Sequence, residues 1–209
     1  MVVRYVFLIN FLLCPWFSWA QFVDTTDYYF TGQIRGKGMI HHQVKEGQWR
    51  YFYPDGKLNA VEDYIAGKLD GEVNYFYPNG KLQGKENWRK GSLTDSAFYF
   101  YNNGTLEKKG MFQRSQYVGA WRFYFENGKL NRTLNYLNGF PEGETKIYSD
   151  DGTLVQHGYY HLGQEIGEWA FFDEKGKIQY TGKYDQGKRV GDWYQYDRKG
   201  NRKAWKYRD

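Results

Sequence analysis

Aromatic and polar residues alternate along short segments, and these segments recur through most of the chain. Two examples are Trp49-Arg50-Tyr51-Phe52-Tyr53 and Trp121-Arg122-Phe123-Tyr124-Phe125, each followed by a turn-forming stretch and a glycine. An alternation with period two predicts β-strands, because successive side chains of a strand point to opposite faces of a sheet. No stretch keeps a 3.6-residue periodicity, so the pattern predicts no helix in the mature chain.

Glycine sets a 24-residue repeat. The first glycine column is Gly56, Gly80, Gly104, Gly128, Gly152, Gly176 and Gly200. A second column follows eleven residues later, at Gly67, Gly91, Gly139, Gly163 and Gly187, with Ser115 in place of glycine. A third column opens the units at residues 47, 71, 95, 119, 143, 167 and 191, with Asp95 as the exception. Each unit therefore predicts a β-hairpin with a glycine turn at either end.

The predicted fold is all-β: an elongated antiparallel array of β-hairpins, as a single-layer meander or solenoid. Seven tandem repeats occupy residues 47–209. Residues 21–46 form a degenerate half-repeat, because Gly38-Met39-Ile40 matches Gly110-Met111-Phe112. Array ends of this irregular kind blunt exposed edge strands.

The turn sequence Tyr53-Pro54-Asp55-Gly56-Lys57 predicts which residues face each other. Pro54 and Asp55 suit a type I turn, and Gly56 suits the following position with φ > 0. Residue 52 then lies opposite residue 58. If the second turn is of the same type, even-numbered positions share one face, which would also include Tyr64. This predicts a packing column that is aromatic in every unit: Phe52, Phe76, Phe100, Tyr124, Tyr148, Phe172 and Tyr196.

The odd-numbered face is less regular. Trp49 and Trp121 share a column with Val73, Ala97 and Thr145. Packing demands should repeat with the unit, so a column that varies this much is either tolerant or shaped for a partner. The tryptophans either shield the strand backbone or contact a ligand. The second hypothesis gives the candidate partner-binding residues Trp49, Tyr51, Trp121, Phe123, Trp169, Phe171 and Trp193.

Composition agrees with a sheet. Aromatic residues make up 21% of the chain, 25 residues are glycine and only 4 are proline, while mean hydropathy is −0.84. Aromatic residues suit pleated sheets. The net charge is +5, with Lys and Arg spread evenly along the repeats. Without a basic block, nucleic acid is not an expected partner.

The first 20 residues predict a secretory signal peptide. Arg4 is their only charged residue, an apolar stretch runs from Tyr5 to Phe17, and Ser18-Trp19-Ala20 places small residues before a cleavage site at Gln21. The expected location is therefore the periplasm, the cell envelope or the exterior. No later segment is apolar enough to span a membrane. The only cysteine, Cys14, would be removed with the signal, which excludes disulfides and thiol catalysis.

No motif indicates an enzyme, a metal site or a cofactor. His157 and His161 flank Tyr159 without an acidic residue at metal-binding spacing. Asp150 and Asp151 occupy a turn, where Asp is common. The glycines recur with the repeat and do not precede a helix, so they form no phosphate-binding loop. We expect a non-enzymatic module that binds or scaffolds a protein.

The unit G-x-W-x-[YF]-[YF]-x-x-[DN]-G-K-L, followed by an aromatic residue and a second glycine, resembles the bacterial variant of the MORN repeat. Chains of this kind are often grouped as YwqK-type antitoxins. The resemblance covers residue 47 to about residue 205. It implies an elongated hairpin array that contacts proteins or lipids. An antitoxin with a signal peptide would have to neutralise an exported or envelope toxin.

A second resemblance is to choline-binding cell-wall repeats, which also combine Gly-Trp with aromatic pairs. Their aromatic cages hold quaternary ammonium groups by cation–π contact. The period here is longer, and the Lys-Leu after the turn glycine belongs to the MORN-like pattern. A glycan or choline-type ligand is the alternative to a protein partner.

Overall fold

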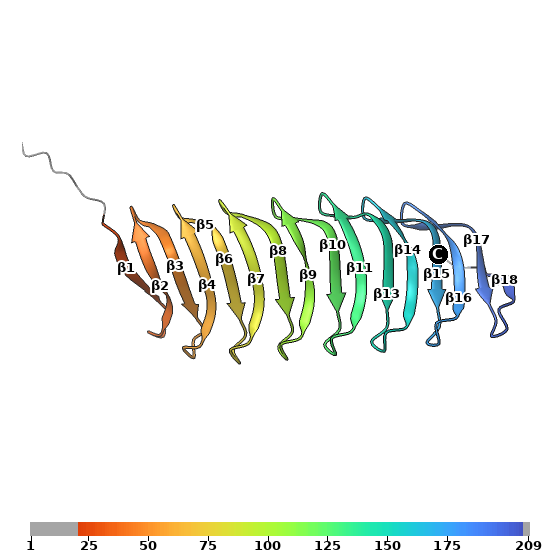
Figure 1. The fold of residues 1–209 in the computed structure, drawn as a ribbon, viewed down its shortest axis with the longest axis horizontal. Coiled ribbons are helices and arrows are strands. Elements are labelled where there is room, and N and C mark those ends of the chain that lie inside the picture. Colours follow the sequence, from red (N-terminus) through yellow and green to blue (C-terminus); the bar gives the residue numbers. More distant parts are fainter. Residues whose placement is uncertain (1–20, 207–209) are drawn as a thin grey trace, which may run out of the picture.

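The computed structural model describes residues 21–206, which form one antiparallel sheet (Figure 1). The predicted signal peptide, residues 1–20, lies outside the described residues. The strands are β1 (Val23–Tyr28), β2 (Ile34–His41), β3 (Val44–Phe52), β4 (Leu58–Ile65), β5 (Lys68–Leu69), β6 (Gly71–Phe76), β7 (Leu82–Arg89), β8 (Ser92–Phe100), β9 (Leu106–Gln113), β10 (Gln116–Tyr124), β11 (Leu130–Leu137), β12 (Phe140–Pro141), β13 (Gly143–Tyr148), β14 (Leu154–His161), β15 (Gln164–Phe172), β16 (Ile178–Asp185), β17 (Lys188–Tyr196) and β18 (Arg202–Ala204).

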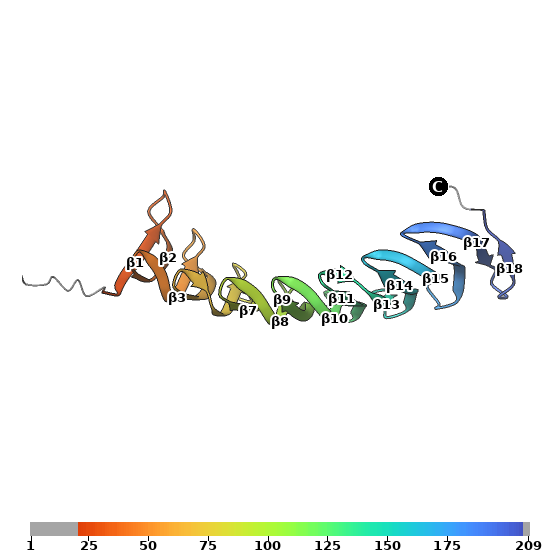
Figure 2. The same ribbon diagram turned by 90° about the horizontal axis from the view of Figure 1, so that it is seen from above.

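Consecutive strands pair antiparallel, except that β5 and β6 both pair with β4 and that β12 and β13 both pair with β11, so the sheet is a meander. The strands lie side by side across a long axis, in a single twisted layer (Figure 2). Within residues 21–206 there is no helix, and hence none that could cross a bilayer. The predicted all-β hairpin array is confirmed.

The first turn of each unit has the predicted geometry. The Tyr53 N–H donates to the Lys57 carbonyl at 2.8 Å, and the Gly56 N–H donates to the Tyr53 carbonyl at 2.9 Å. Gly56 has φ +82°, and all seven glycines of the first column have positive φ. Glycine populates this region freely because it has no Cβ. Phe52 lies opposite Leu58, as predicted.

The prediction that even-numbered positions share one face is wrong. The second turn is not of the first type: Ala66 and Gly67 both have positive φ, as in a two-residue type I′ turn, and Ile65 pairs with Lys68. A bulge beside Phe52 also shifts the register, so that Tyr51 lies opposite Ala60. Both features pair odd-numbered residues with even-numbered ones.

Tyr64 therefore lies across from Gly47, on the face that carries Trp49 and Tyr51. We call this the tryptophan face, defined by Trp49, Trp121, Trp169 and Trp193, and the opposite one the polar face. The core lies on the tryptophan face, because all four tryptophans are buried there. The face predicted to hold the protein together is thus not the one that carries the core.

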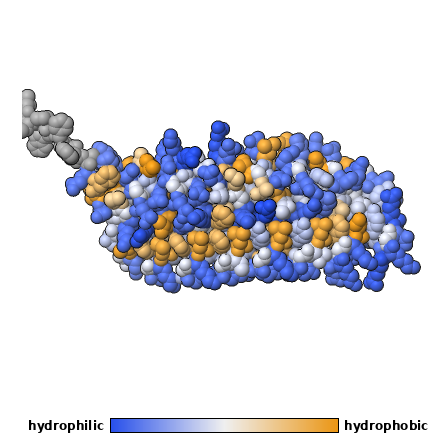
Figure 3. All heavy atoms as spheres, viewed as in Figure 1, coloured by the Kyte–Doolittle hydropathy of each residue, from blue (hydrophilic) through white to orange (hydrophobic). Residues whose placement is uncertain are grey.

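The predicted packing column forms a secondary apolar row. Phe52, Phe76, Phe100, Tyr124, Tyr148, Phe172 and Tyr196 are all half-buried. They lie beside the first turns, where Leu58 and Phe76 of successive hairpins line a shared hollow. Figure 3 shows apolar groups recurring as a row along this margin of the sheet. Hydrogen bonds also join successive units here, for example from the Tyr53 hydroxyl to the Phe76 carbonyl at 2.7 Å.

The third glycine column lies within strands and does not form turns. Gly47 has φ +65° inside β3, and Gly119 has φ +64° inside β10. The register shifts at these positions, which leaves Gly38 opposite the segment 47–49. Asp95 keeps the same conformation with φ +56°, a region that Asp tolerates better than most residues. Because of these bulges, the tryptophan of a bulged strand lies opposite the last strand of the preceding hairpin.

Candidate functional site

The tryptophans of the tryptophan face pack flat on glycines. Trp49 covers Gly38, Trp121 covers Gly110, Trp169 covers Gly158 and Trp193 covers Gly182. A Cβ at Gly110 would come within 2.2 Å of the Trp121 ring, so no larger residue fits beneath it. The indole nitrogens of Trp49 and Trp121 donate to the carbonyls of Met39 and Met111, at 2.9 and 3.0 Å.

In units without tryptophan, a larger residue on the preceding strand occupies the space that the tryptophan ring fills elsewhere. Val73, Ala97 and Thr145 replace the tryptophan, and all three are fully buried. The residues eleven positions earlier, glycine in the other units, are here Glu62, Glu86 and Leu134. The two columns therefore vary together in size: a large residue on one strand accompanies a small one on the next.

This pairing corrects the prediction that the tryptophan column faces a partner. The column varies because its neighbour compensates, and dense packing requires that compensation. Trp49, Trp121, Trp169 and Trp193 are at most 3% exposed, so their rings cannot form a contact surface in the folded chain. They are core residues. The relationship was visible in the sequence as a glycine eleven residues before each of these tryptophans.

The other predicted partner-binding residues form a half-buried aromatic row beside the tryptophans. Tyr51, Phe123 and Phe171 belong to it, and Tyr75 and Tyr99 continue it. Their rings lie next to the buried ones: the centroids of Trp121 and Phe123 are 6.2 Å apart, and those of Trp169 and Phe171 are also 6.2 Å apart. This row follows the length of the sheet.

Basic side chains lie over several of these rings. The Lys45 ammonium is 4.7 Å from the Trp49 ring centroid, 4.8 Å from that of Tyr51 and 5.0 Å from that of Tyr64. The Arg132 guanidinium is 4.6 Å from the Phe123 ring centroid. Contacts of this kind are favourable because the ring face is negative. Sequence analysis missed both cations, since they become neighbours of the rings only through the strand register.

The units that start at residues 47 and 71 carry carboxylates on the same face. The Tyr64 hydroxyl donates to Glu62 at 2.6 Å. The Tyr99 hydroxyl and the Trp88 indole N–H donate to the two oxygens of Glu86, at 2.5 and 2.9 Å. Burial, reinforced by the hydrogen bond to Glu86, raises the pKa of Tyr99 well above its usual range. Glu86 is only 8% exposed, so its two donors replace the water that it has lost.

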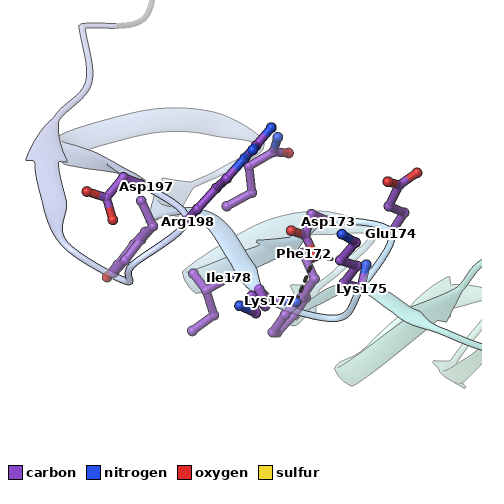
Figure 4. A pocket seen from close by; sticks show the side chains of 10 residues that line it. Phe172, Asp173, Glu174, Lys175, Lys177, Ile178, Asp197 and Arg198 are labelled. Atoms are coloured by element: carbon purple, nitrogen blue, oxygen red, sulfur yellow. Dashed lines mark hydrogen bonds between the residues drawn. The ribbon is translucent and has the colours of Figure 1, made fainter.

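Three open hollows on the surface lie outside this row. One lies between the last two first-type turns, where Phe172, Ile178 and Tyr196 are surrounded by Asp173, Lys175, Lys177 and Arg198 (Figure 4). It is open to solvent and lined largely by turn residues, which suits a surface contact better than an enclosed ligand. Residues 21–206 contain no group of His, Cys, Asp or Glu arranged to hold a metal ion.

Two kinds of solved structure match this chain at low TM-scores. The complex of TcdB2, TccC3 and Cdc42 matches with 12% identity and a TM-score of 0.20, over 83% of this chain and 13% of that one. A porin-like protein from Bacteroides uniformis matches with 8% identity and a TM-score of 0.21, over 81% of this chain and 88% of that one. This chain thus spans a small part of the first of these chains, and at such scores neither likeness carries a conclusion. No curated protein matches this chain.

The family described as "MORN repeat variant" matches five segments, residues 45–66, 69–90, 117–138, 141–161 and 165–186. Each contains a first-type turn and the strands on either side of it. The unmatched stretch from 91 to 116 contains Asp95 and Ser115, which replace two of the repeat glycines but keep positive φ, at +56° and +62°. The chain belongs to the MORN repeat variant family.

Proposed function

We propose that the chain is an exported, non-enzymatic repeat protein that binds a protein partner along its tryptophan face. The observation that carries the proposal is the half-buried aromatic row of Tyr51, Phe123 and Phe171, which lies on a rigid layer of buried tryptophans. Rigid aromatic side chains bind with little loss of conformational entropy and are common hot spots. Residues 21–206 form a single sheet, so no second layer of these residues covers this face.

The test compares two triple variants in a crosslinking pull-down from envelope extract. One removes the row at Tyr51→Ala, Phe123→Ala and Phe171→Ala. The control removes exposed apolar residues elsewhere, at Ile65→Ala, Leu137→Ala and Leu162→Ala. We expect the first variant to lose its captured protein while the control keeps it, with both shown to be folded by circular dichroism. Loss in the control alone, or in neither variant, contradicts the proposal.

Export is a separate part of the proposal, supported by the sequence of residues 1–20. Cleavage after Ala20 would leave Gln21 as the first residue, immediately before β1. The intact mass of the protein from its native host tests this directly. A mature product that still contains Met1 or Cys14 would contradict cleavage at this site.

A second candidate function is binding of an organic cation such as choline or a basic side chain. It is favoured by the Lys45 ammonium, which lies within 5.0 Å of three ring centroids and shows that these rings accept a cation. A ligand would have to displace this lysine, so Lys45→Ala should strengthen binding of choline. Isothermal titration calorimetry with choline tests this candidate function. The absence of a binding heat for both the wild type and Lys45→Ala would contradict it. A glycan ligand is tested in the same way with envelope polysaccharide.

A further inference from the structure

Within residues 21–206, the two ends of the sheet differ from its interior because each has a strand edge without a complete neighbour. At one end β1 pairs, among these residues, with β2 alone. At the other end β17 pairs with β18 only from Tyr194 to Tyr196. Figure 1 shows β1 at one extreme of the long axis and β17 and β18 at the other. An open edge offers backbone N–H and C=O groups to another strand.

The two ends are in phase with the repeat. Val23–Tyr28 lies one period before the segment from Gly47 to Phe52, so β1 is a first strand of a unit. The turn that follows β1 has the geometry of the first turns, because the Tyr29 N–H donates to the Gln33 carbonyl at 2.8 Å. By the same period, Arg202–Ala204 corresponds to the start of β4, so β18 is a second strand.

Within the array every second strand pairs with the first strand of the following unit. Ala60 of β4 lies opposite Tyr75 of β6, for example. A second copy whose β1 is placed beside β18 would therefore continue the array without a break. The register of Ala60 and Tyr75 then places Ala204 opposite the second copy's Asp27.

The charges of the two ends are complementary. β1 carries the exposed Asp24, together with Asp27, which forms a 3.5 Å ion pair with Arg35 of β2, and it has no basic residue of its own, whereas the C-terminal end carries Arg202, Lys203 and Lys206. Two antiparallel β1 strands in a centred register would oppose Asp24 and Asp27, and two β18 strands would bring basic residues together. Like charges directly opposite each other destabilise a strand pair. Only the pairing of unlike ends avoids this repulsion.

Exposed apolar side chains are also found at the N-terminal edge of the sheet. Phe22, Val23 and Tyr28 are each about half exposed, and all belong to the N-terminal edge. At the other end Trp205 packs on the ring of Trp193 at 5.9 Å, and its backbone N–H donates to the Trp193 carbonyl at 2.7 Å. This closes the row of buried tryptophans and leaves the backbone edge as the surface to be paired.

We propose that the chain binds a second copy of itself head to tail, with β1 of one molecule adding to β18 of the next. The contact joins two different surfaces, so it does not close on itself in a dimer and extends the sheet into longer assemblies. It is independent of the tryptophan face, which would continue from one molecule to the next.

Sedimentation velocity of the purified protein tests the association. The average mass should rise with protein concentration and fall as salt is added, because the contact brings opposite charges together at the solvent-accessible edges of the sheet. A monomer at every concentration in low salt overturns the proposal.

Charge reversal tests the direction of pairing. Asp24→Lys with Asp27→Lys should leave the chain monomeric, and so should Arg202→Glu with Lys203→Glu. Mixing these two variants should restore association. The first then has a basic β1 edge and the second an acidic β18 edge, so the two edges again carry opposite charges. Association of either variant alone, or no association in the mixture, would overturn head-to-tail pairing.

Control variants carry the same charge changes away from the ends. Glu126→Lys with Glu174→Lys matches the first variant, and Arg122→Glu with Lys175→Glu matches the second; all four residues are exposed. These should associate as the wild type does. If they also become monomeric, net charge and not the strand edges governs association, and the proposal is wrong. Thermal melts of all variants confirm that each is folded.

Discussion

Two regions of the sheet build the same backbone around different cores. From Gly110 to Trp193, three tryptophans lie on three glycines, and Leu134 with Thr145 fills the one remaining unit. In the earlier units that contain Val73 and Ala97, small core residues accompany glutamates. The first region has no buried charged side chain in its core, whereas the second satisfies a buried carboxylate with two donors. The repeat thus fixes the strand spacing and the total volume, but not the chemistry that fills it.

The largest effect should follow from emptying a tryptophan site. We expect Trp121→Ala to destabilise the fold by about 3–5 kcal/mol, because it removes a fully buried ring and leaves a cavity over Gly110. Val73→Ala, in the region without tryptophan, should cost about 1–2 kcal/mol, since it removes far less buried volume. Urea unfolding of both variants measures the difference. Equal midpoints would show that Trp121 is not a core residue.

A size exchange tests the pairing itself. Gly110→Leu alone should be strongly destabilising, because a Cβ there would meet the Trp121 ring at 2.2 Å. Combined with Trp121→Thr it recreates the pair that Leu134 and Thr145 form two strands further along. The double variant should be more stable than the sum of the single changes predicts, by about 0.5–3 kcal/mol of coupling. Simple additivity would mean that the two columns vary independently.

The sequence predicted the hairpins and the first turns, because these depend on local chemistry. Gly56 and its equivalents have the positive φ that the Pro-Asp-Gly pattern requires. It did not predict which face carries the core. That assignment depended on the second turn, where Ala66 takes φ +49°, and on a bulge beside Phe52. A non-glycine residue with positive φ leaves little trace in a sequence, and one extra residue exchanges the two faces.

In the candidate site, too, the features that depend on local sequence could be predicted and those that depend on strand register could not. The half-buried row of Tyr51, Phe123 and Phe171 could be predicted as one column, since its members share a position in the repeat. Its tryptophan neighbours were misinterpreted because each column was judged alone. The cations over the rings, such as Lys45 and Arg132, could not be predicted, because their contacts depend on the strand register and the bulges within each hairpin.

A turn glycine outside both cores should have an intermediate effect. Gly80 has φ +82° and open space around its Cα, so Gly80→Val is limited by backbone strain alone. We expect a loss of about 1–3 kcal/mol. Lys81→Ala, at the next residue, removes an exposed hydrogen bond that the Lys81 ammonium donates to the Asn103 carbonyl. This change should lower the free energy of unfolding by under about 0.5 kcal/mol. Thermal melts that shift equally would show that the strain is absent.

The smallest effect concerns alkaline pH, and it separates the two regions again. Burial raises the pKa of Tyr64, Tyr75 and Tyr99 above the usual value of 10.0, and nearby glutamates raise each further. Burial also raises the pKa of Tyr136, but there Arg132 acts in the opposite direction. In the unfolded chain these phenols ionise near pH 10 while the folded chain keeps their protons. The unfolded state therefore binds fewer protons, and stability falls as pH rises above about 10.

Glu86→Gln should weaken this dependence. It removes the negative charge beside Tyr75 and Tyr99 but retains an oxygen that can accept the Tyr99 hydrogen bond. The pKa of both phenols should move toward its usual value, so the variant should lose less stability than the wild type between pH 10 and pH 11. Urea midpoints at the two pH values, with Glu165→Gln beside Tyr160 as the matched control in the tryptophan-rich region, measure the change. If Glu86→Gln leaves the slope unchanged while the control alters it, the buried carboxylate does not set the tyrosine pKa values, and the two regions differ in packing alone.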